Sequence, residues 1–374
     1  MRGNRRIARR AEKKIEQLDT ASATRLALAV PAGKTPRVSV VLPVRNAAAT
    51  VARAVASIRA QAFADWELIA VDDGSTDGTR EILRALARDE PRLAPVERDH
   101  AGVAAAANTA MAAARGDLIA RMDADDVSHP ERLAAQVAFL DAPAHRGIGV
   151  AGSLVEFGGD RAASAGYALH VDWLNTLVTP EAIALNRFVE SPQANPSVMF
   201  RRELVARHGG CRAGDFPEDY ELWLRWLDAG VRMAKVPRPL LTWHDPPTRL
   251  TRTDPRYDPE AFFRVKAPWI ARELARVAHG REIWIWGAGR PTRKRAAHLG
   301  EHGVRIAGYI DVDARKATPA LGGTGAPVIP PAGLPPPSRA LVLGYVARRG
   351  ARDFVRSQLH LRGYAEGRDF LMCA

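Results

Sequence analysis

Three short acidic clusters hold the side chains best suited to chemistry in this sequence. Asp123-Ala124-Asp125-Asp126 places three carboxylates within four residues. Such carboxylates repel one another unless a positive charge neutralises them, and a divalent cation can do so. Hard oxygen ligands that leave room for phosphate oxygens suit Mg²⁺ or Mn²⁺. The cluster therefore predicts a metal-diphosphate site, and the alternatives are a helix cap or a solvated turn.

The other two clusters also have structural alternatives. Asp72-Asp73-Gly74-Ser75 contains the residue types that build turns. Glu218-Asp219 opens a helical segment, where an acid pair favours the helix dipole. The functional interpretation of this pair is a general base that takes a proton from an acceptor hydroxyl.

The elements around these clusters alternate between strand and helix. We expect strands at 37–42, 66–71 and 117–121, and helices at 49–62, 78–88, 103–114 and 130–140. This rhythm is typical of a doubly wound, mostly parallel sheet. In such sheets ligands bind outside the carboxyl ends of the strands. The first and second clusters follow strands, so we expect them at one edge of the sheet.

Beyond residue 150 the rhythm loosens, and a second α/β unit begins near residue 260. Residues 158–197 are expected to face the substrate, a helix is expected at 219–229, and the Pro- and Arg-rich stretch 237–259 resembles a linker. Further expected elements are helices at 260–279 and 347–361 and strands at 281–286, 305–310 and 339–343. The predicted domains are a basic extension (1–35), an α/β domain (36–250), a linker and helix (251–280) and a smaller Rossmann-like domain (281–374).

The second unit contains a partial dinucleotide-binding pattern. Gly287-Ala288-Gly289-Arg290-Pro291-Thr292 has Thr292 where the third glycine would stand, and Asp311 follows about 20 residues on. The interpretations left open are a tight strand-to-helix turn, the binding of a nucleotide or anion, and redox catalysis.

The charge balance is strongly basic, with 54 Lys and Arg against 42 Asp and Glu and a net charge of +12. Residues 1–14 hold seven of the basic residues and one Glu. The basic residues lack the interleaved aromatics of a single-strand nucleic-acid surface, so we expect no nucleic-acid partner. The alternatives are an Arg-rich surface with a basic N-terminal helix, or peripheral attachment of residues 1–18 to a membrane.

Three features that the sequence lacks bear on the cellular compartment of the protein. The sequence has no apolar run of membrane-spanning length, and its basic start lacks the apolar core of a secretory signal. Cys211 and Cys373 stand far apart, without metal-ligand spacing. We expect free thiols and a cytoplasmic protein, with the inner face of the membrane as an alternative location. The oligomeric state stays open.

Four motifs in order resemble those of family 2 glycosyltransferases with the GT-A fold. They are Val-Ser-Val-Val-Leu-Pro-Val-Arg-Asn (38–46), Val-Asp-Asp-Gly-Ser-Thr-Asp (71–77), Asp-Ala-Asp-Asp (123–126) and Glu-Asp-Tyr-Glu-Leu-Trp (218–223). The resemblance spans about residues 36–245. It implies an inverting enzyme that moves a sugar from a nucleotide-sugar donor, with UDP-sugars favoured, to a glycan or lipid-linked acceptor.

The resemblance also implies roles for single residues on the donor side. Pro43 and Arg45 would line the nucleotide pocket. Asp73 would hydrogen-bond the nucleobase, and Asp72 would support its turn. Asp123 and Asp125 would hold the ribose and a diphosphate-bound Mn²⁺ or Mg²⁺.

Further roles concern the metal, the base and the acceptor. Asp126 and His244 are the remaining candidate metal ligands. Asp219 matches the catalytic base, with Glu218 beside it. Asn195 and Trp173 are candidates for the acceptor side.

The sequence also departs from the family pattern. Ala107 precedes Asn108 where Arg or Lys is frequent, and Asn195-Pro196-Ser197 stands where His-Pro-Ser is common. No Gln-x-x-Arg-Trp run follows the base, which disfavours a processive synthase. Alternative functions are a catalytically silent nucleotide- or glycan-binding scaffold in envelope polysaccharide assembly, a nucleotidyltransferase and a nicotinamide-dependent enzyme.

Overall fold

The computed structural model describes residues 35–316, 326–348 and 350–374. The predicted membrane-attachment segment, residues 1–18, lies outside these ranges, as does nearly all of the basic extension. Within the described ranges, no helix combines the length and the apolar character needed to cross a membrane.

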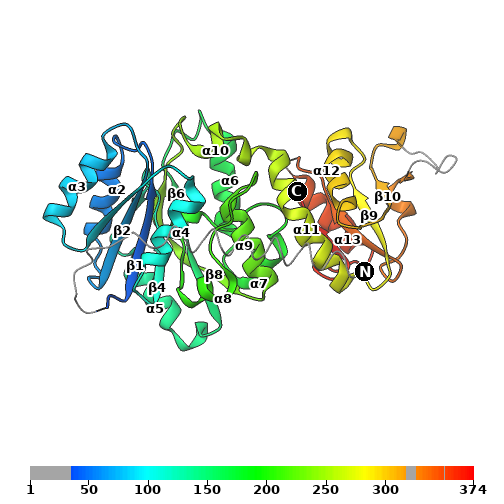
Figure 1. Ribbon diagram of the computed structural model, residues 1–374. Coiled ribbons are helices and arrows are strands. Elements are labelled where there is room, and N and C mark those ends of the chain that lie inside the picture. The colour runs from blue at the N-terminus through cyan, green and yellow to red at the C-terminus, as the bar shows by residue number, and fades with distance from the viewer. Residues whose placement is uncertain (1–34, 317–325, 349) are drawn as a thin grey trace, which may run out of the picture. The chain divides into compact units, whose positions relative to one another are not determined.

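An eight-stranded sheet forms the larger part of the fold (Figure 1), with the order β3-β2-β1-β4-β7-β6-β8-β5. Its strands are β1 (Val38–Val44), β2 (Trp66–Asp73), β3 (Leu93–Arg98), β4 (Leu118–Arg121), β5 (Val127–Ser128), β6 (Ile148–Phe157), β7 (Met199–Arg201) and β8 (Arg232–Trp243). Strands β1 to β4 run parallel, whereas β7 pairs antiparallel with β4 and β6. The half of the sheet that contains β1 to β4 is therefore parallel.

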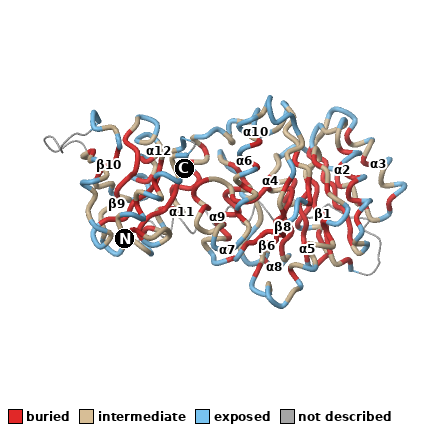
Figure 2. Tube along the Cα trace, turned by 180° about the vertical axis from the view of Figure 1, so that it is seen from behind, coloured by how far each residue is buried: buried red, intermediate tan, exposed pale blue. Residues whose placement is uncertain are grey.

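Helices cover both faces of this sheet. They are α2 (Val51–Arg59), α3 (Thr79–Asp89), α4 (Val103–Ala113), α5 (Arg132–Asp141), α6 (Ala165–Thr176), α7 (Pro180–Asn186), α8 (Glu203–His208) and α9 (Glu218–Asp228). One core cluster joins alternate β1 residues to α2, α3, α5 and α6, and a second joins the opposite face to α4, α7, α8 and α9. Figure 2 shows the strands red along most of their length, as continuous apolar runs require when both faces are covered.

The register brings the carboxyl ends of the central strands to one edge. Val44 of β1 pairs with Asp72 of β2, and Val41 of β1 pairs with Arg121 of β4. The Asp72-Asp73 turn and the Asp123–Asp126 cluster therefore leave the sheet at the same edge, as the sequence predicts.

A second sheet of five parallel strands has the order β11-β10-β9-β12-β13. It consists of β9 (Glu282–Trp286), β10 (Ile306–Ile310), β11 (Val328–Ile329), β12 (Ala340–Gly344) and β13 (Phe370–Met372). Helices α11 (Pro259–Val277) and α12 (Arg290–Gly300) pack on one face, and α13 (Ala351–His360) packs on the other. The predicted α/β class with a larger and a smaller sheet is confirmed. That the smaller sheet forms a Rossmann-like domain stays a prediction, and whether this domain binds a nucleotide stays open.

The linker predicted at 237–259 is wrong for its first part. Residues 232–243 form β8, which pairs with β6 on one side and with β5 on the other. The β6–β8 register shifts between the Val236 and Pro239 pairs, so Pro237 falls at an irregularity that tolerates proline. The following residues form two short helices, α10 (Leu250–Thr253) and η4 (Pro255–Tyr257).

The second sheet shares a core with helix α9. Tyr220 and Leu224 of α9 belong to the same buried cluster as Leu343 of β12 and Leu371 of β13. Lys266 of α11 is 1% exposed, and its ammonium group donates to the carbonyls of Phe188 (2.9 Å) and Cys373 (2.6 Å). The helix that begins with Glu218-Asp219 is therefore packed between the two sheets.

Candidate functional site

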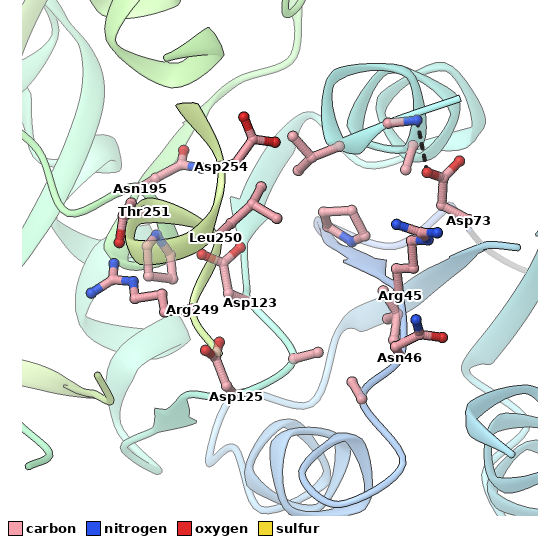
Figure 3. Close-up of a pocket in the computed structure, with 18 of the residues that line it drawn as sticks. Arg45, Asn46, Asp73, Asp123, Asp125, Asn195, Arg249, Leu250, Thr251 and Asp254 are labelled. Atoms are coloured by element: carbon pink, nitrogen blue, oxygen red, sulfur yellow. Dashed lines mark hydrogen bonds between the residues drawn. The ribbon is translucent and has the colours of Figure 1, made fainter. Parts of the chain in front are cut away.

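A cavity of about 630 Å³ opens at the carboxyl edge of the large sheet. It collects residues from the ends of β1, β2 and β4, from the start of α9, and from the segment after β8. The predicted site residues that line it are Pro43, Arg45, Asp73, Asp123, Asp125, Asn195, Glu218 and Asp219. Figure 3 shows Arg45, Asn46 and Asp73 on one side and Asp123, Asp125 and Arg249 on the other.

The loops after β1 and β2 are fastened to each other on one side of the cavity. Asn46 adopts a positive φ of 49°, which asparagine tolerates better than most residues. Its side-chain oxygen accepts from the Thr76 amide at 2.9 Å, and its own amide donates to Ser75 Oγ at 2.9 Å. This pairing fixes the segment that carries Pro43 and Arg45.

Asp73 organises the adjacent loop from β3 to α4. Its carboxylate is 2% exposed and accepts from the amides of Ala101 (3.1 Å) and Gly102 (2.8 Å). His100 Nδ1 lies 2.8 Å from the same carboxylate. Both Asp73 oxygens thus already have partners within the chain, and its contact with a nucleobase stays a prediction.

Asp72 lies beneath the turn rather than in the cavity lining. It is 1% exposed, pairs with Arg80 at 3.0 Å and receives a weak hydrogen bond from the Ser75 amide at 3.3 Å. These contacts fit the supporting role expected for Asp72.

The third cluster brings like charges together on the other side of the cavity. Burial and the neighbouring Asp123 raise the pKa of Asp125. Burial, followed by the charge of Asp125, raises the pKa of Asp126 well above its usual range. Arg53 donates to the Asp125 carbonyl at 2.9 Å and so holds the turn in place. A positive charge between these carboxylates would relieve their repulsion.

The described residues fit a cation that arrives with a diphosphate better than a preformed metal cage. Within the described ranges, no three His, Cys, Asp or Glu side chains are grouped to hold a metal ion. Two carboxylates, Asp123 and Asp125, reach the cavity, and Mg²⁺ commonly binds one or two carboxylates together with substrate phosphates. Asp126 Oδ2 and His244 Nδ1 are buried without a described partner, beside this cluster.

Asp126 and His244 stand next to each other behind the cavity lining. Asp126 is 1% exposed, and its Oδ1 accepts from the His244 amide at 2.8 Å. The His244 ring nitrogen Nδ1 lies 3.9 Å from the same oxygen. Metal ligation by either side chain stays a prediction.

The acid pair occupies the first turn of α9 at the cavity wall. Glu218 is 5% exposed, and its Oε2 accepts a 2.6 Å hydrogen bond from the hydroxyl of Tyr257. Asp219 is half-buried, and its Oδ1 accepts from the Tyr220 amide at 2.7 Å. Burial raises the pKa of both carboxyls, and the charge of Glu218 raises that of Asp219 further.

The segment after β8 forms a wall of the cavity that the linker interpretation missed. It contributes Arg249, Asp254, Arg256 and Tyr257 to the lining. Arg249 lies over the Trp243 ring at 4.5 Å and donates to the Tyr167 hydroxyl. Burial and Asp123 raise the pKa of Asp125, and the charge of the Arg249 guanidinium opposes that rise, so Arg249 offers a positive charge beside the acidic cluster.

Arg121 is a second functional candidate that the sequence reasoning missed. It ends β4, lines the cavity and is 4% exposed. Its Nη2 donates to Asp123 Oδ1 at 3.1 Å. A charged residue at the end of the apolar run Leu118–Ala120 is the signal that could have identified it.

The two acceptor-side candidates have different environments. Asn195 begins η3 (Asn195–Ser197) and lines the cavity. Trp173 of α6 does not line it; its ring packs against core clusters of both sheets and lies 5.1 Å from the Arg352 guanidinium. Ala107 is 1% exposed and faces the core, while the cavity is lined by Ala106.

The Gly287–Thr292 turn in the second sheet is closely packed. A Cβ on Gly287 would lie 2.9 Å from Val346 Cγ2, and the residue has a φ of +113°. Asp311 Oδ2 accepts from the Ala288 amide at 3.0 Å and from Lys316 Nζ at 3.0 Å. These contacts explain the glycine and the aspartate without a ligand.

The comparisons with known proteins agree with this geometry. The family model described as glycosyl transferase family 2 matches residues 39–209. The "Putative glycosyltransferase EpsE" of Bacillus subtilis (strain 168) is 34% identical over 204 residues, covering 53% of this chain and 69% of EpsE. The chain belongs to glycosyltransferase family 2, and it is a glycosyltransferase.

Two further proteins are similar over a shorter stretch or at a lower sequence identity. The Escherichia coli UDP-Glc:alpha-D-GlcNAc-diphosphoundecaprenol beta-1,3-glucosyltransferase WfgD is 35% identical over 104 residues, covering 28% of this chain and 40% of WfgD. The crystal structure of S. aureus TarS 1–349 in complex with UDP-GlcNAc aligns with a TM-score of 0.50 and 19% identity, covering 71% of each chain. The TarS likeness supports the fold.

Proposed function

We propose that this glycosyltransferase is inverting and metal-dependent, and that Asp219 is its general base. The observation that carries the proposal is that Asp123, Asp125 and Asp219 line one cavity, although they come from the β4 end and from α9. A donor diphosphate would lie beside Asp123 and Asp125, and an acceptor hydroxyl beside Asp219. A carboxylate opposite the leaving group is what an in-line displacement requires.

Different residues would act on the leaving diphosphate and on the acceptor hydroxyl. Asp123 and Asp125 would hold Mn²⁺ or Mg²⁺, which when bound stabilises the negative charge of the departing diphosphate. Arg249 adds a fixed positive charge on the same side. Asp219 would remove the proton of the acceptor hydroxyl, and its raised pKa suits a base that works near neutral pH.

For the substrates we propose only the class of the donor and the class of the acceptor. A UDP-sugar donor and a lipid-linked or glycan acceptor are favoured, because the name of WfgD specifies UDP-Glc and a diphosphoundecaprenol acceptor. The acceptor would then be met at the inner face of the membrane. Attachment through residues 1–18 remains part of this proposal.

Nucleoside diphosphate release tests the proposal. Purified protein with Mn²⁺ is incubated with a panel of UDP-, GDP- and TDP-sugars. We expect release from at least one donor, loss of release with EDTA, and loss in Asp125→Ala with an unchanged unfolding temperature. Binding without turnover of any donor, by protein that is correctly folded, would instead favour the silent scaffold.

A further inference from the structure

Arg121 has an unused hydrogen-bond donor inside the cavity wall. Its Nη2 is paired with Asp123, whereas its Nη1 is buried and has no partner among the described residues. Buried polar groups are nearly always paired in native proteins, and an unpaired donor of a charged group is costly. Since Arg121 lines the cavity, a bound ligand could supply the missing partner.

The chemistry of the guanidinium restricts that partner. A guanidinium carries five N–H donors and no acceptor, so Nη1 needs an oxygen acceptor. A nucleotide-sugar donor offers three kinds of acceptor, the oxygens of the nucleoside, of the diphosphate and of the sugar. Which of these meets Nη1 depends on the position of Arg121 relative to the Asp123–Asp126 cluster and to the Glu218–Asp219 pair.

Arg121 lines the same cavity as both acidic groups. It contacts Asp123 on the proposed diphosphate side, and Glu218 and Asp219 line the cavity with it. In an in-line displacement the transferred sugar lies between the leaving diphosphate and the base. The proposed diphosphate side already has the charged groups of Asp123, Asp125 and Arg249, so the sugar is the part of the donor that still lacks a charged partner.

We propose that Arg121 Nη1 donates a hydrogen bond to an oxygen of the transferred sugar, which makes Arg121 a determinant of donor-sugar specificity. The inference rests on the proposed function, because it requires a nucleotide-sugar donor in this cavity. Asp123 would then have a second role, since its hydrogen bond to Nη2 orients the guanidinium toward the sugar.

Binding of matched ligand pairs tests the inference. Calorimetry with Mn²⁺ measures the Kd of each nucleotide sugar in the panel and of the corresponding nucleoside diphosphate, for the wild type and for Arg121→Met. For the donor that the wild type binds, we expect the variant to weaken nucleotide-sugar binding about tenfold or more, the range of a hydrogen bond to a charged group. Binding of the nucleoside diphosphate should change by less than about twofold.

Three controls separate the outcomes. Arg201→Met removes an arginine of β7 that bonds the Leu140 carbonyl at 2.8 Å, and it should leave both Kd values unchanged. Deoxy-sugar donors identify the contacted oxygen: for one of them, wild type and Arg121→Met should bind equally weakly. Arg121→Lys keeps the charge near Glu218 and Asp219, so its pH profile should match the wild type while the sugar contact is lost.

Several results would overturn the inference. Equal weakening of nucleotide sugar and nucleoside diphosphate would make Arg121 a contact of the nucleoside diphosphate and not of the sugar. Unchanged Kd values with a lowered unfolding temperature would make its role structural. If the wild type binds no nucleotide sugar, the proposed function fails and this inference fails with it.

Discussion

The hydroxyl of Tyr257 donates a 2.6 Å hydrogen bond to Glu218 Oε2. Glu218 begins α9, whereas Tyr257 ends η4 in the wall that follows β8. The contact therefore ties the cavity wall to the helix that presents the proposed base. It also lowers the pKa of Glu218, against the effect of burial.

Tyr257→Phe should reduce transfer without unfolding the protein. The substitution removes the partner of a buried carboxylate, whose pKa then rises further, and it loosens the wall beside Asp219. We expect kcat/KM to fall about tenfold, the effect of losing one charge-assisted hydrogen bond. Tyr309→Phe on β10 in the second sheet is the matched control and should leave kcat/KM unchanged. Equal effects of the two substitutions would show that the Tyr257 contact has no special role.

The rate of transfer should rise with pH through about 7. Asp219 accepts a proton only when it is ionised, and burial together with the charge of Glu218 raises its pKa to about 7. Below that pH the base is protonated, so kcat/KM should fall about tenfold per pH unit on the acid side. An acid limb that lies near pH 4 would contradict the assignment of a carboxyl with a raised pKa as the base.

Asp219→Asn should abolish transfer and stabilise the fold at pH 8. The folded-state pKa of Asp219 lies above its unfolded value, so the folded state binds the extra proton between about pH 4 and 7, and wild-type stability falls as pH rises through that window. Asparagine avoids this loss and can still accept from the Tyr220 amide. We expect the unfolding temperature to rise by roughly 2–4 °C at pH 8 and to change little at pH 4. Lower stability of the variant at pH 8 would contradict a raised pKa for Asp219 in the folded state.

Asp125→Ala should remove the effect of Mn²⁺ on donor binding. Asp125 is one of two carboxylates that reach the cavity from the acidic cluster, so its loss weakens the bound cation and the diphosphate with it. We expect at least a hundredfold loss of activity, and no added thermal stabilisation by a nucleoside diphosphate when Mn²⁺ is present. Asp117→Asn is the control, because Asp117 precedes β4 at its other end and is 69% exposed. If Asp125→Ala kept Mn²⁺-dependent binding, Asp125 would not be a metal ligand.

Lys266→Met should destabilise the whole described fold. The buried ammonium group of Lys266 donates to the carbonyl of Phe188 and to that of Cys373, which follows β13. Methionine has no donor, so both carbonyls would lose this partner. We expect the free energy of unfolding, measured in urea, to fall by about 2 kcal/mol, because buried carbonyls lose their donor. Lys294→Met is the matched control, since that side chain is 68% exposed and its pair with Glu260 should contribute less than about 1 kcal/mol. A single transition that shifts in the first variant would show that the two sheets unfold together.

Local sequence patterns were sufficient to predict the part of the site that lies on parallel strands. The apolar runs of β1 and β2 and the acidic turns after β2 and β4 predict one sheet edge, because parallel strands end on the same side. Glu218-Asp219 could be identified from its motif, although no local pattern shows that α9 faces the same cavity. That convergence depends on the packing of α9 against both sheets, through Leu222 and Trp223 on one side and through Tyr220 and Leu224 on the other.

The segment after β8 could not be predicted as part of the cavity wall, because its position also depends on contacts between residues that are distant in sequence. Pro237 and Pro239 suggested a linker, but the β6–β8 pairing accommodates them at a register shift. Arg249 and Tyr257 lie in a segment without periodicity, so their position depends on contacts with Tyr167 and Glu218 that are distant in sequence. The acceptor-side role of Trp173 stays a prediction, although its partly buried ring packs against the core and does not line the cavity.

The stereochemistry of sugar release tests the proposed mechanism most directly. Time-resolved proton NMR would follow the anomeric signal when the wild type, with Mn²⁺, acts on an α-linked nucleotide sugar, with water or an added glycan as acceptor. We expect the β-anomer to form first, and no release by Asp219→Asn although it still binds the donor. Initial formation of the α-anomer, or undiminished release by Asp219→Asn, would contradict an inverting displacement assisted by Asp219.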